Sequence, residues 1–206
     1  MSSTVGLSSS LTEIQLIGLS REGDPFVREN VARHRNTGTT TLEDLSKDPN
    51  PYVRKAVANN SSCGPMTLKR LAEDDNSYVR VAVASHHNCL RATFGALGKD
   101  PDARVRQAVA SNRNTDAETL IALLKDPNAL VRQHAVYNHN MPLAVLLEYL
   151  ESRATTKHDA GPSSKRTTHA IVGRPDCTTN ILERLLQLPH PTVQYIARER
   201  LTKNRV

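Results

Sequence analysis

The chain has 206 residues, of which 38% are hydrophobic and 3% aromatic, and it contains no Trp. This composition argues against a single dense globular core. The 27 Lys and Arg residues exceed the 21 Asp and Glu residues and give a formal net charge of +6. Such a moderate excess favours anionic partners without identifying one.

No run of apolar residues approaches the roughly 18 that are needed to cross a bilayer, so we expect no membrane span. The first residues, MSSTVGLSSSL, lack the positive start and the apolar stretch of a secretory signal. Three cysteines cannot all pair within one chain. These features predict a protein of a reducing, cytoplasmic compartment.

A Val-Arg pair recurs every 26 residues, which indicates an internal repeat. The pairs are Val27-Arg28, Val53-Arg54, Val79-Arg80, Val105-Arg106 and Val131-Arg132. Other positions follow the same register. An acidic residue stands five residues before each Val, and a Leu or Phe stands fifteen residues after it.

Beyond residue 150 the register returns only after a shift of 36 residues, which brings Thr167 to the Val position. We interpret the difference as an insertion of ten residues in one copy. The predicted organisation is an N-terminal cap with a half repeat in 1–21, five 26-residue repeats in 22–150, a basic mobile insertion in 151–166, and a sixth repeat with a C-terminal cap in 167–206.

Within each copy, apolar residues spaced three and four apart predict two short helices. The Asp-Pro steps, such as Asp48-Pro49, predict the start of the first helix, because Asp caps free amide groups and Pro suits a helix start. The segment 115–118, Thr-Asp-Ala-Glu, fits a cap of the second helix. A unit of this kind cannot bury its apolar stripe alone and must stack on its neighbours. The predicted fold is therefore an all-α solenoid of two-helix repeats.

The motif Asp-Pro-x-x-x-Val-Arg-x-x-Val-Ala-x-Asn, followed by Thr-x-x-x-x-Leu-x-x-Leu, occurs in residues 100–123. It resembles the leucine-rich repeat variant family over residues 22–150 and, weakly, over 167–201. The resemblance implies stacked short helices without strands, similar to HEAT repeats, in a curved superhelix. The family's best-known architecture also holds an iron–sulfur cluster through clustered N-terminal cysteines. Because the first cysteine here is Cys63, we expect no cofactor.

Two charged ladders share the repeat period. The basic ladder consists of Arg28, Arg54, Arg80, Arg106 and Arg132, and the acidic ladder of Asp48, Asp74, Asp100 and Asp126. A regular row of cations suggests nucleic-acid binding. An Asp and the Arg six residues further on can instead meet within a copy, or across to the next one, through charge-assisted hydrogen bonds. We predict this structural role for both ladders.

The basic excess lies near the C-terminus, since residues 1–150 contain 17 Lys and Arg against 16 Asp and Glu. The predicted mobile loop Glu151–Arg166 and the residues after it supply the candidate anion-binding group. Its members are Arg153, Lys157, Lys165, Arg166, Arg174, Arg198, Arg200 and Lys203. Few aromatic side chains are available to stack on bases. Nucleic-acid binding through this basic end is the alternative function.

The histidines invite a metal site, because His86 and His87 are adjacent. However, His34 and His86 occupy one repeat position two copies apart, a distance of roughly 20 Å, whereas zinc–nitrogen bonds are about 2 Å long. We therefore expect no metal. With Arg35 and Arg113, these histidines are predicted to form a polar, weakly cationic ridge along the turns.

The cysteines Cys63, Cys89 and Cys177 also share one register position. Neighbouring copies lie about 10 Å apart, beyond the usual span of a disulfide between Cα atoms of up to about 6.8 Å. These thiols are therefore predicted to be small filler residues. No pattern places a general base beside any of them.

The outward positions of the second helices become apolar along the chain. Glu43 and Lys69 are polar in the early copies, whereas Ile121 holds the same position later. An apolar helix face is normally covered by something. The candidate partner surface consists of Ala96, Ile121, Ala122 and Leu147.

The sequence supports no phosphate-binding loop, no metal-ligand cluster and no catalytic triad, so we expect a protein without enzymatic activity. A HEAT-like DNA glycosylase is a remote alternative by analogy, because such a site needs aromatic groups and a carboxylate in a positive cleft. The predicted function is a repeat scaffold that mediates protein–protein interaction through the apolar second-helix surface and the polar turn ridge. The sequence does not identify the protein partner.

Overall fold

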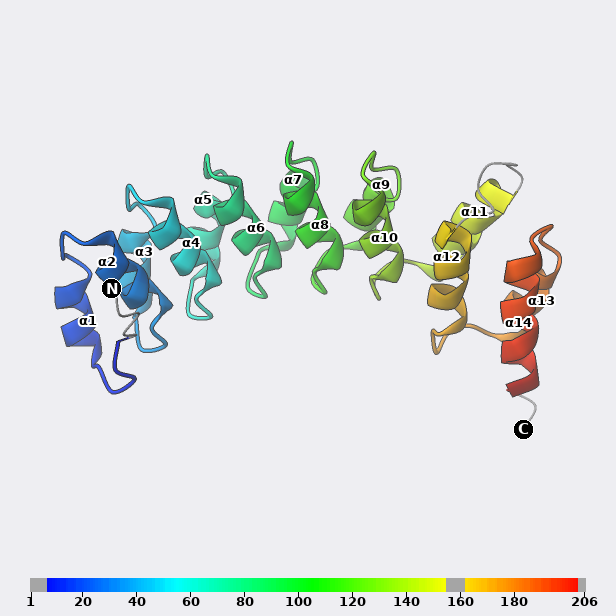
Figure 1. The fold of residues 1–206 in the computed structure, drawn as a ribbon, viewed down its shortest axis with the longest axis horizontal. Helices are drawn as coiled ribbons and strands as arrows, with labels where there is room; N and C mark the ends of the chain where they lie inside the picture. The colour runs from blue at the N-terminus through cyan, green and yellow to red at the C-terminus, as the bar shows by residue number, and fades with distance from the viewer. Residues whose placement is uncertain (1–6, 155–161, 204–206) are drawn as a thin grey trace, which may run out of the picture. The chain divides into compact units, whose positions relative to one another are not determined.

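The computed structural model describes residues 7–154 and 162–203 (Figure 1). Within these ranges the chain forms fourteen helices and no strand, which confirms the predicted all-α class. In chain order the helices are α1 (Glu13–Leu19), α2 (Pro25–Arg33), α3 (Thr39–Leu45), α4 (Pro51–Asn59), α5 (Pro65–Leu71), α6 (Ser77–Ser85), α7 (Arg91–Leu97), α8 (Ala103–Ser111), α9 (Ala117–Leu123), α10 (Ala129–Tyr137), α11 (Leu143–Ala154), α12 (Pro162–Val172), α13 (Thr179–Leu186) and α14 (Pro191–Lys203).

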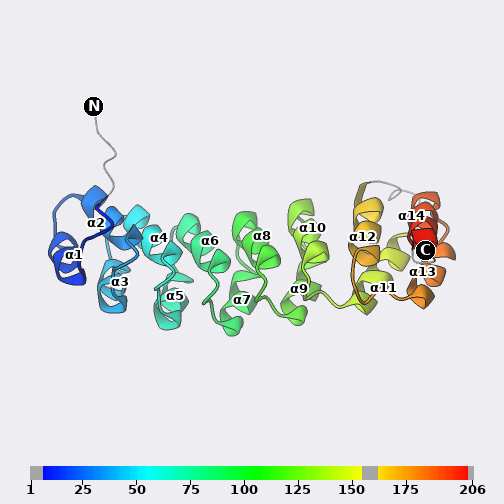
Figure 2. The same ribbon diagram turned by 90° about the horizontal axis from the view of Figure 1, so that it is seen from below.

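From α2 to α10 the copies fold as a nine-residue first helix, which carries the Val-Arg pair, and a seven-residue second helix. The chain forms two compact units, which divide between Thr115 and Asp116. In the first unit, α2, α4, α6 and α8 pack directly on one another, whereas α3, α5 and α7 pack mainly on the first helices. Figure 2 shows the two rows. The first helices therefore form one closely spaced layer.

The core of each unit is built from the apolar positions of the repeat. In α4 the residues Val53 and Val57 are fully buried, as is Leu68 of α5. Phe94 of α7 is the largest fully buried side chain among the described residues. Because each copy's apolar stripe is covered by the next copy, burial of these side chains is the main stabilisation that holds the stack together.

The first helices begin later than the Asp-Pro steps predict. The capping side chains are Asn50, Asn76, Asp102 and Asn128, which stand two residues after the ladder aspartates. Asn50 Oδ1, for example, accepts the Tyr52 N–H at 2.8 Å. Asp48 is therefore not the cap. Its carboxylate accepts the Asn50 N–H at 2.8 Å and is otherwise engaged by an arginine described below.

The second helix that begins after segment 115–118 is capped by Asp116, whose Oδ1 accepts the Thr119 N–H at 2.9 Å. The neighbouring Thr115 has a different role, because its hydroxyl donates to the Val109 carbonyl at 2.6 Å. At the equivalent cap positions, Gly38 and Gly64 offer no side chain. The second helices therefore depend on packing more than on capping.

The predicted insertion 151–166 is helical wherever the structure describes it. Helix α11 continues through residues 151–154, and α12 begins at Pro162. This corrects the expectation of a loop over the whole segment. Ser152 and Arg153 replace the Asp-Pro step that follows α9 as Asp126-Pro127, and α11 continues to twelve residues.

Among the described residues, no helix combines the length and the apolar composition that a membrane span requires.

The packing predicts a sharp contrast within α5. Replacing the fully buried Leu68 by Ala should lower the free energy of unfolding by about 2–5 kcal/mol, because the change leaves a cavity. The matched change Met66→Ala removes a side chain that is 69% exposed in the same helix and should cost less than about 1 kcal/mol. Urea denaturation followed by circular dichroism measures both. Equal losses would contradict the assigned packing.

Candidate functional site

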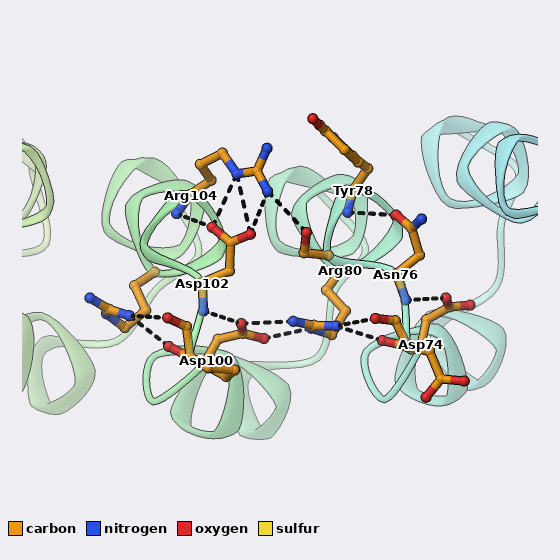
Figure 3. A network of polar contacts seen from close by, with 11 residues as sticks. Asp74, Asn76, Tyr78, Arg80, Asp100, Asp102 and Arg104 are labelled. Carbon is orange, nitrogen blue, oxygen red and sulfur yellow. Dashed lines mark hydrogen bonds and ion pairs between the residues drawn. The ribbon is translucent and has the colours of Figure 1, made fainter.

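The two charged ladders meet between copies. Arg28 reaches forward to Asp48 with its Nε and Nη2 atoms, at 2.6 and 3.1 Å from the two carboxylate oxygens. Arg54 binds Asp74 in the same way at 2.6 and 2.8 Å, and Arg80 binds Asp100 at 2.6 and 3.0 Å. Figure 3 shows the last of these pairs. The sequence left open whether pairing is within or between copies, and the structure shows that it is between them.

The remaining nitrogen of each guanidinium holds the turn of its own copy. Arg54 Nη1 donates to the carbonyls of Asp48 and Pro49 at 2.8 and 3.2 Å. Arg106 and Arg132 make the same pair of bonds to the two residues at the start of their own copies. One arginine therefore binds two backbone carbonyls and one carboxylate, and the bonds to the carbonyls of the turn fix the orientation of its planar guanidinium.

Asp48 and Asp74 are ionised in spite of burial. Burial alone would raise the pKa of Asp74, but the Arg54 guanidinium and the Asn76 N–H outweigh it and hold this pKa below its usual value. The side chains of Arg54 and Asp74 are only 18% and 6% exposed. The pair is therefore a bond between copies that water screens weakly, and removing one partner, which leaves the other charge buried and uncompensated, costs far more than breaking a surface pair.

A second set of polar bonds crosses between copies at the turns. The position that ends each first helix holds His34, Asn60, His86, Asn112 and Asn138 in successive copies. Asn60 Nδ2 donates to the Ala32 carbonyl of the preceding copy at 2.7 Å, and Asn112 Nδ2 donates to Ala84 at 2.8 Å. His86 Nε2 lies 3.0 Å from the Asn60 carbonyl. These side chains tie one turn to the previous one.

Histidine and asparagine can replace each other at this position because each offers an acceptor on one side and a donor on the other, although the asparagine amide donates to two carbonyls, as Asn60 does to Ala32 and His34. Asn60 Oδ1 accepts the Ser62 N–H at 2.9 Å, and His86 Nδ1 accepts the Asn88 N–H at 3.0 Å. The ring nitrogen Nε2 of His86 must then carry the hydrogen that is donated to the carbonyl. Burial lowers the pKa of His86 against the opposing effect of the Asn60 carbonyl, with a smaller lowering by His87. The bonded form is the neutral one.

These bonds correct the predicted polar ridge. His34 and His86 are only 8% and 6% exposed, so they belong to the contact between copies and not to a free surface. Arg35, His87 and Arg113 are exposed as predicted. In the part of the chain that the structure describes, no three His, Cys, Asp or Glu side chains are grouped to hold a metal ion.

The cysteines lie where small side chains fill the stack. Cys63 and Cys89 are buried and unpaired, and burial raises the pKa of each to about 11. Burial also raises the pKa of the half-buried Cys177. Thiols of this kind remain protonated at neutral pH and are poor nucleophiles.

Only some of the residues of the predicted partner surface are accessible in the structure. Ala96 and Ala122 are exposed, and Ile121 is half-buried. Leu147 is only 5% exposed, which removes it from that surface. Its helix α11 is longer than the other second helices and packs against α12, so a position that faces solvent elsewhere is covered there.

The structure shows an exposed apolar row that the sequence analysis missed. Phe26, Tyr52 and Tyr78 stand directly before the Val of their copies and are 46%, 66% and 53% exposed. We call these three residues the aromatic row. They lie on the same outward face of α2, α4 and α6, in the closely spaced first-helix layer. The recurrence of an aromatic residue every 26 positions could have indicated this row. However, the sequence of a Tyr-Val or Phe-Val pair does not show which of the two side chains faces solvent.

Cations and a groove extend this face. The Arg104 guanidinium lies 4.5 Å from the centre of the Tyr78 ring, and Lys55 Nζ lies 5.7 Å from it. Arg104 also pairs with Asp102, as Figure 3 shows. A groove of about 410 Å³ lies between α6 and α8, lined by Val81 and Ser85 of α6 and by Arg104 and Gln107 of α8.

The candidate anion-binding residues are less available than their charges suggest. Arg174 pairs with Asp176 at 2.9 Å and donates to the Met141 carbonyl, and Lys203 pairs with Glu199 at 3.0 Å. Lys165, Arg198 and Arg200 are exposed. Lys157 and the side chains of Arg153 and Arg166 lie outside the described residues. Nucleic-acid binding by this group stays a prediction.

Loss of one ladder rung should lower stability strongly. Arg80→Ala leaves the Asp100 carboxylate, whose side chain is 5% exposed, without its charged partner and should cost about 3 kcal/mol. The control Arg33→Ala removes the exposed pair with Glu29 within α2 and should cost about 0.5 kcal/mol or less. Thermal and urea unfolding measure both. An unchanged stability in Arg80→Ala would exclude a structural ladder.

His86 should make stability depend on pH. Because its folded pKa is below the unfolded value, the unfolded chain binds the proton better, and stability falls as the pH drops below about 6.5. His86→Asn keeps both bonds and should shrink the difference between urea midpoints at pH 7.5 and pH 5. The control His87→Asn, at the exposed neighbour, should leave most of it. Asp48 and Asp74, whose pKa values are lowered by their arginine partners, ionise below this window and do not interfere. The same pH dependence in His86→Asn and in the original chain would contradict the assignment.

Comparison with known proteins gives a structural likeness only. No protein-family model matches the chain, and no curated protein matches it. A solved structure described as a designed armadillo repeat protein has a TM-score of 0.42 at 17% identity, over 92% of this chain and 98% of its own. Another, described as a leucine-rich repeat variant with a novel repetitive structural motif, has a TM-score of 0.64 at 25% identity, over 92% of this chain and 72% of its own. The resemblance to the leucine-rich repeat variants that the sequence predicted is confirmed.

Proposed function

We propose that the chain is a non-enzymatic scaffold that binds an extended segment of a partner protein along the aromatic row. The observation that carries this proposal is the recurrence of three exposed aromatic side chains, Phe26, Tyr52 and Tyr78, at one position of the repeat. Aromatic side chains are costly to leave in water and are enriched at the centres of protein interfaces. The proposal moves the partner surface from the second helices to the first-helix layer.

The spacing of the row suits a polyproline II segment. Adjacent packed helices lie about 8–10 Å apart, so successive rings of the row are separated by about that distance. A polyproline II chain turns once in three residues and rises about 9 Å in that turn. Every third side chain of such a segment would then meet one ring. Docking of this conformation on aromatic-lined surfaces is a common mode of peptide recognition.

The charges beside the row favour acidic residues in the partner. Both Lys55 and Arg104 lie near the Tyr78 ring of α6. Lys55 comes from the preceding first helix, α4, and Arg104 comes from the following one, α8. The groove between α6 and α8 adds room for a side chain next to this ring. We therefore expect a ligand with an apolar residue or Pro at every third position and with Asp or Glu between them.

The partner surface is tested with peptides displayed from a random twelve-residue library. Peptides selected on the full chain should share the three-residue spacing. Their affinity, measured by fluorescence anisotropy, should fall about tenfold or more in the double variant Tyr52→Ser/Tyr78→Ser. Because both side chains are exposed, the melting temperature should change little.

The control is Met66→Ser, which removes an exposed apolar side chain from the other layer. It should leave the affinity unchanged. An equal loss in the control and in the double variant, or no loss in either, would contradict binding on the row. A parallel titration with random DNA separates the alternative function, since affinity that falls steeply with salt would favour the basic C-terminal end.

A further inference from the structure

Among the described residues, no carboxylate pairs with the Nε–Nη2 edge of Arg132. In Arg28, Arg54 and Arg80, Nη1 holds the turn of the arginine's own copy, and the edge formed by Nε and Nη2 binds a carboxylate of the next copy. Arg132 Nη1 holds its turn in the same way, at 2.6 and 2.9 Å from the carbonyls of Asp126 and Pro127. Its Nε–Nη2 edge therefore points toward the next copy, whose first helix is α12.

Neither register position that could supply the next aspartate holds an acidic residue. Counting 26 residues from Asp126 gives Ser152, and counting the 36 that restore the register gives Pro162. In earlier copies the aspartate stands in the turn three residues after the second helix ends, as Asp48 follows Leu45. Helix α11 instead continues through Ala154, so no turn is available at Ser152 to deliver an acidic side chain.

Arg132 lines a pocket of about 80 Å³. It is lined by Arg132, Gln133, Val136 and Tyr137 of α10, by Tyr149 of α11 and by Thr167 of α12, all within the second unit. One water molecule needs about 10–15 Å³ by the same measure, so the pocket has room for a carboxylate and the carbon that carries it. Val136 and the half-exposed Tyr137 offer apolar walls for such a carbon.

We propose that this Arg132 pocket binds a carboxylate, supplied by an Asp or Glu side chain of a polypeptide ligand. The planar ion would replace the missing rung and accept two parallel hydrogen bonds from the Nε–Nη2 edge, as the aspartates do in the first unit. This proposal is independent of the aromatic row, because it concerns residues of the second unit and a different chemical group.

The test follows the side-chain Nε–H signals of the arginines by NMR while sodium acetate replaces sodium chloride at constant ionic strength. The Arg132 signal is assigned by its loss in Arg132→Gln. It should shift with saturation, whereas the signals of Arg28, Arg54 and Arg80 should not move, because their edges are occupied. Absence of a saturable shift at Arg132 would overturn the proposal.

Two variants make a negative result interpretable. Asp74→Ser opens the equivalent edge of Arg54, and acetate should then shift the Arg54 signal, which shows that such an edge is detectable. Arg132→Lys keeps the charge without the fork and should weaken acetate binding about tenfold or more, as judged from a probe signal of a lining residue such as Tyr149. A response at Arg54 in Asp74→Ser with none at Arg132 would contradict the pocket.

The source of the carboxylate is resolved by comparing ligands. N-acetyl-glutamate N-methylamide and its aspartate analogue represent polypeptide side chains, and one of them should bind more tightly than acetate or succinate. Preference for succinate would mean a free small molecule and would overturn the polypeptide assignment. Asp159→Asn removes the one acidic residue of segment 155–161. Acetate binding that appears only in this variant would show that the chain's own carboxylate fills the pocket and would exclude an external ligand.

Discussion

The bidentate pair between an arginine and the aspartate of the following copy is the constraint on which the stack depends. A single two-helix copy cannot cover its own apolar face, so it is stable only against a neighbour. Apolar contact alone allows neighbouring helices to slide, whereas the Arg54–Asp74 geometry, with two parallel bonds of 2.6 and 2.8 Å, permits one register. The third bond, from Nη1 to the turn, fixes the direction of the arginine. The apolar core thus provides the stability, and the ladder makes the arrangement of the copies specific.

The fold could be predicted from the sequence because its signal is periodic. Val53 and Leu68 repeat at 26-residue intervals, and only stacked copies bury such positions continuously. Local starts were harder to predict. Asp48 and Asn50 are both good caps by type, and the structure assigns the cap to Asn50 because Arg28 engages Asp48. Arg28, which lies twenty positions before Asp48, therefore determines which of the two residues caps the helix.

The candidate surfaces were less predictable than the fold, for related reasons. By its residue type, Tyr52 could belong to the buried apolar stripe of its helix. The sequence does not show that the neighbouring Val53 is the buried residue and that Tyr52 is exposed. Leu147 was assigned to the surface by register, but the extension of α11 covers it. The open edge of Arg132 could have been noticed as a gap in the acidic series after Asp126. Its meaning required the orientation of the guanidinium, which only the three-dimensional arrangement gives.

The exchange of histidine for asparagine at the ends of the first helices changes the response of stability to pH without removing the bonds between copies. Asn60 and His86 both accept the N–H two residues further on and both bond to the carbonyl 26 residues before them, while Asn60 also donates to Ala32, so either residue joins a turn to the previous one. The choice between them does alter how many protons the unfolded chain can take up. Acid sensitivity of an array of this kind can therefore be set copy by copy, as a graded quantity, while its shape is conserved.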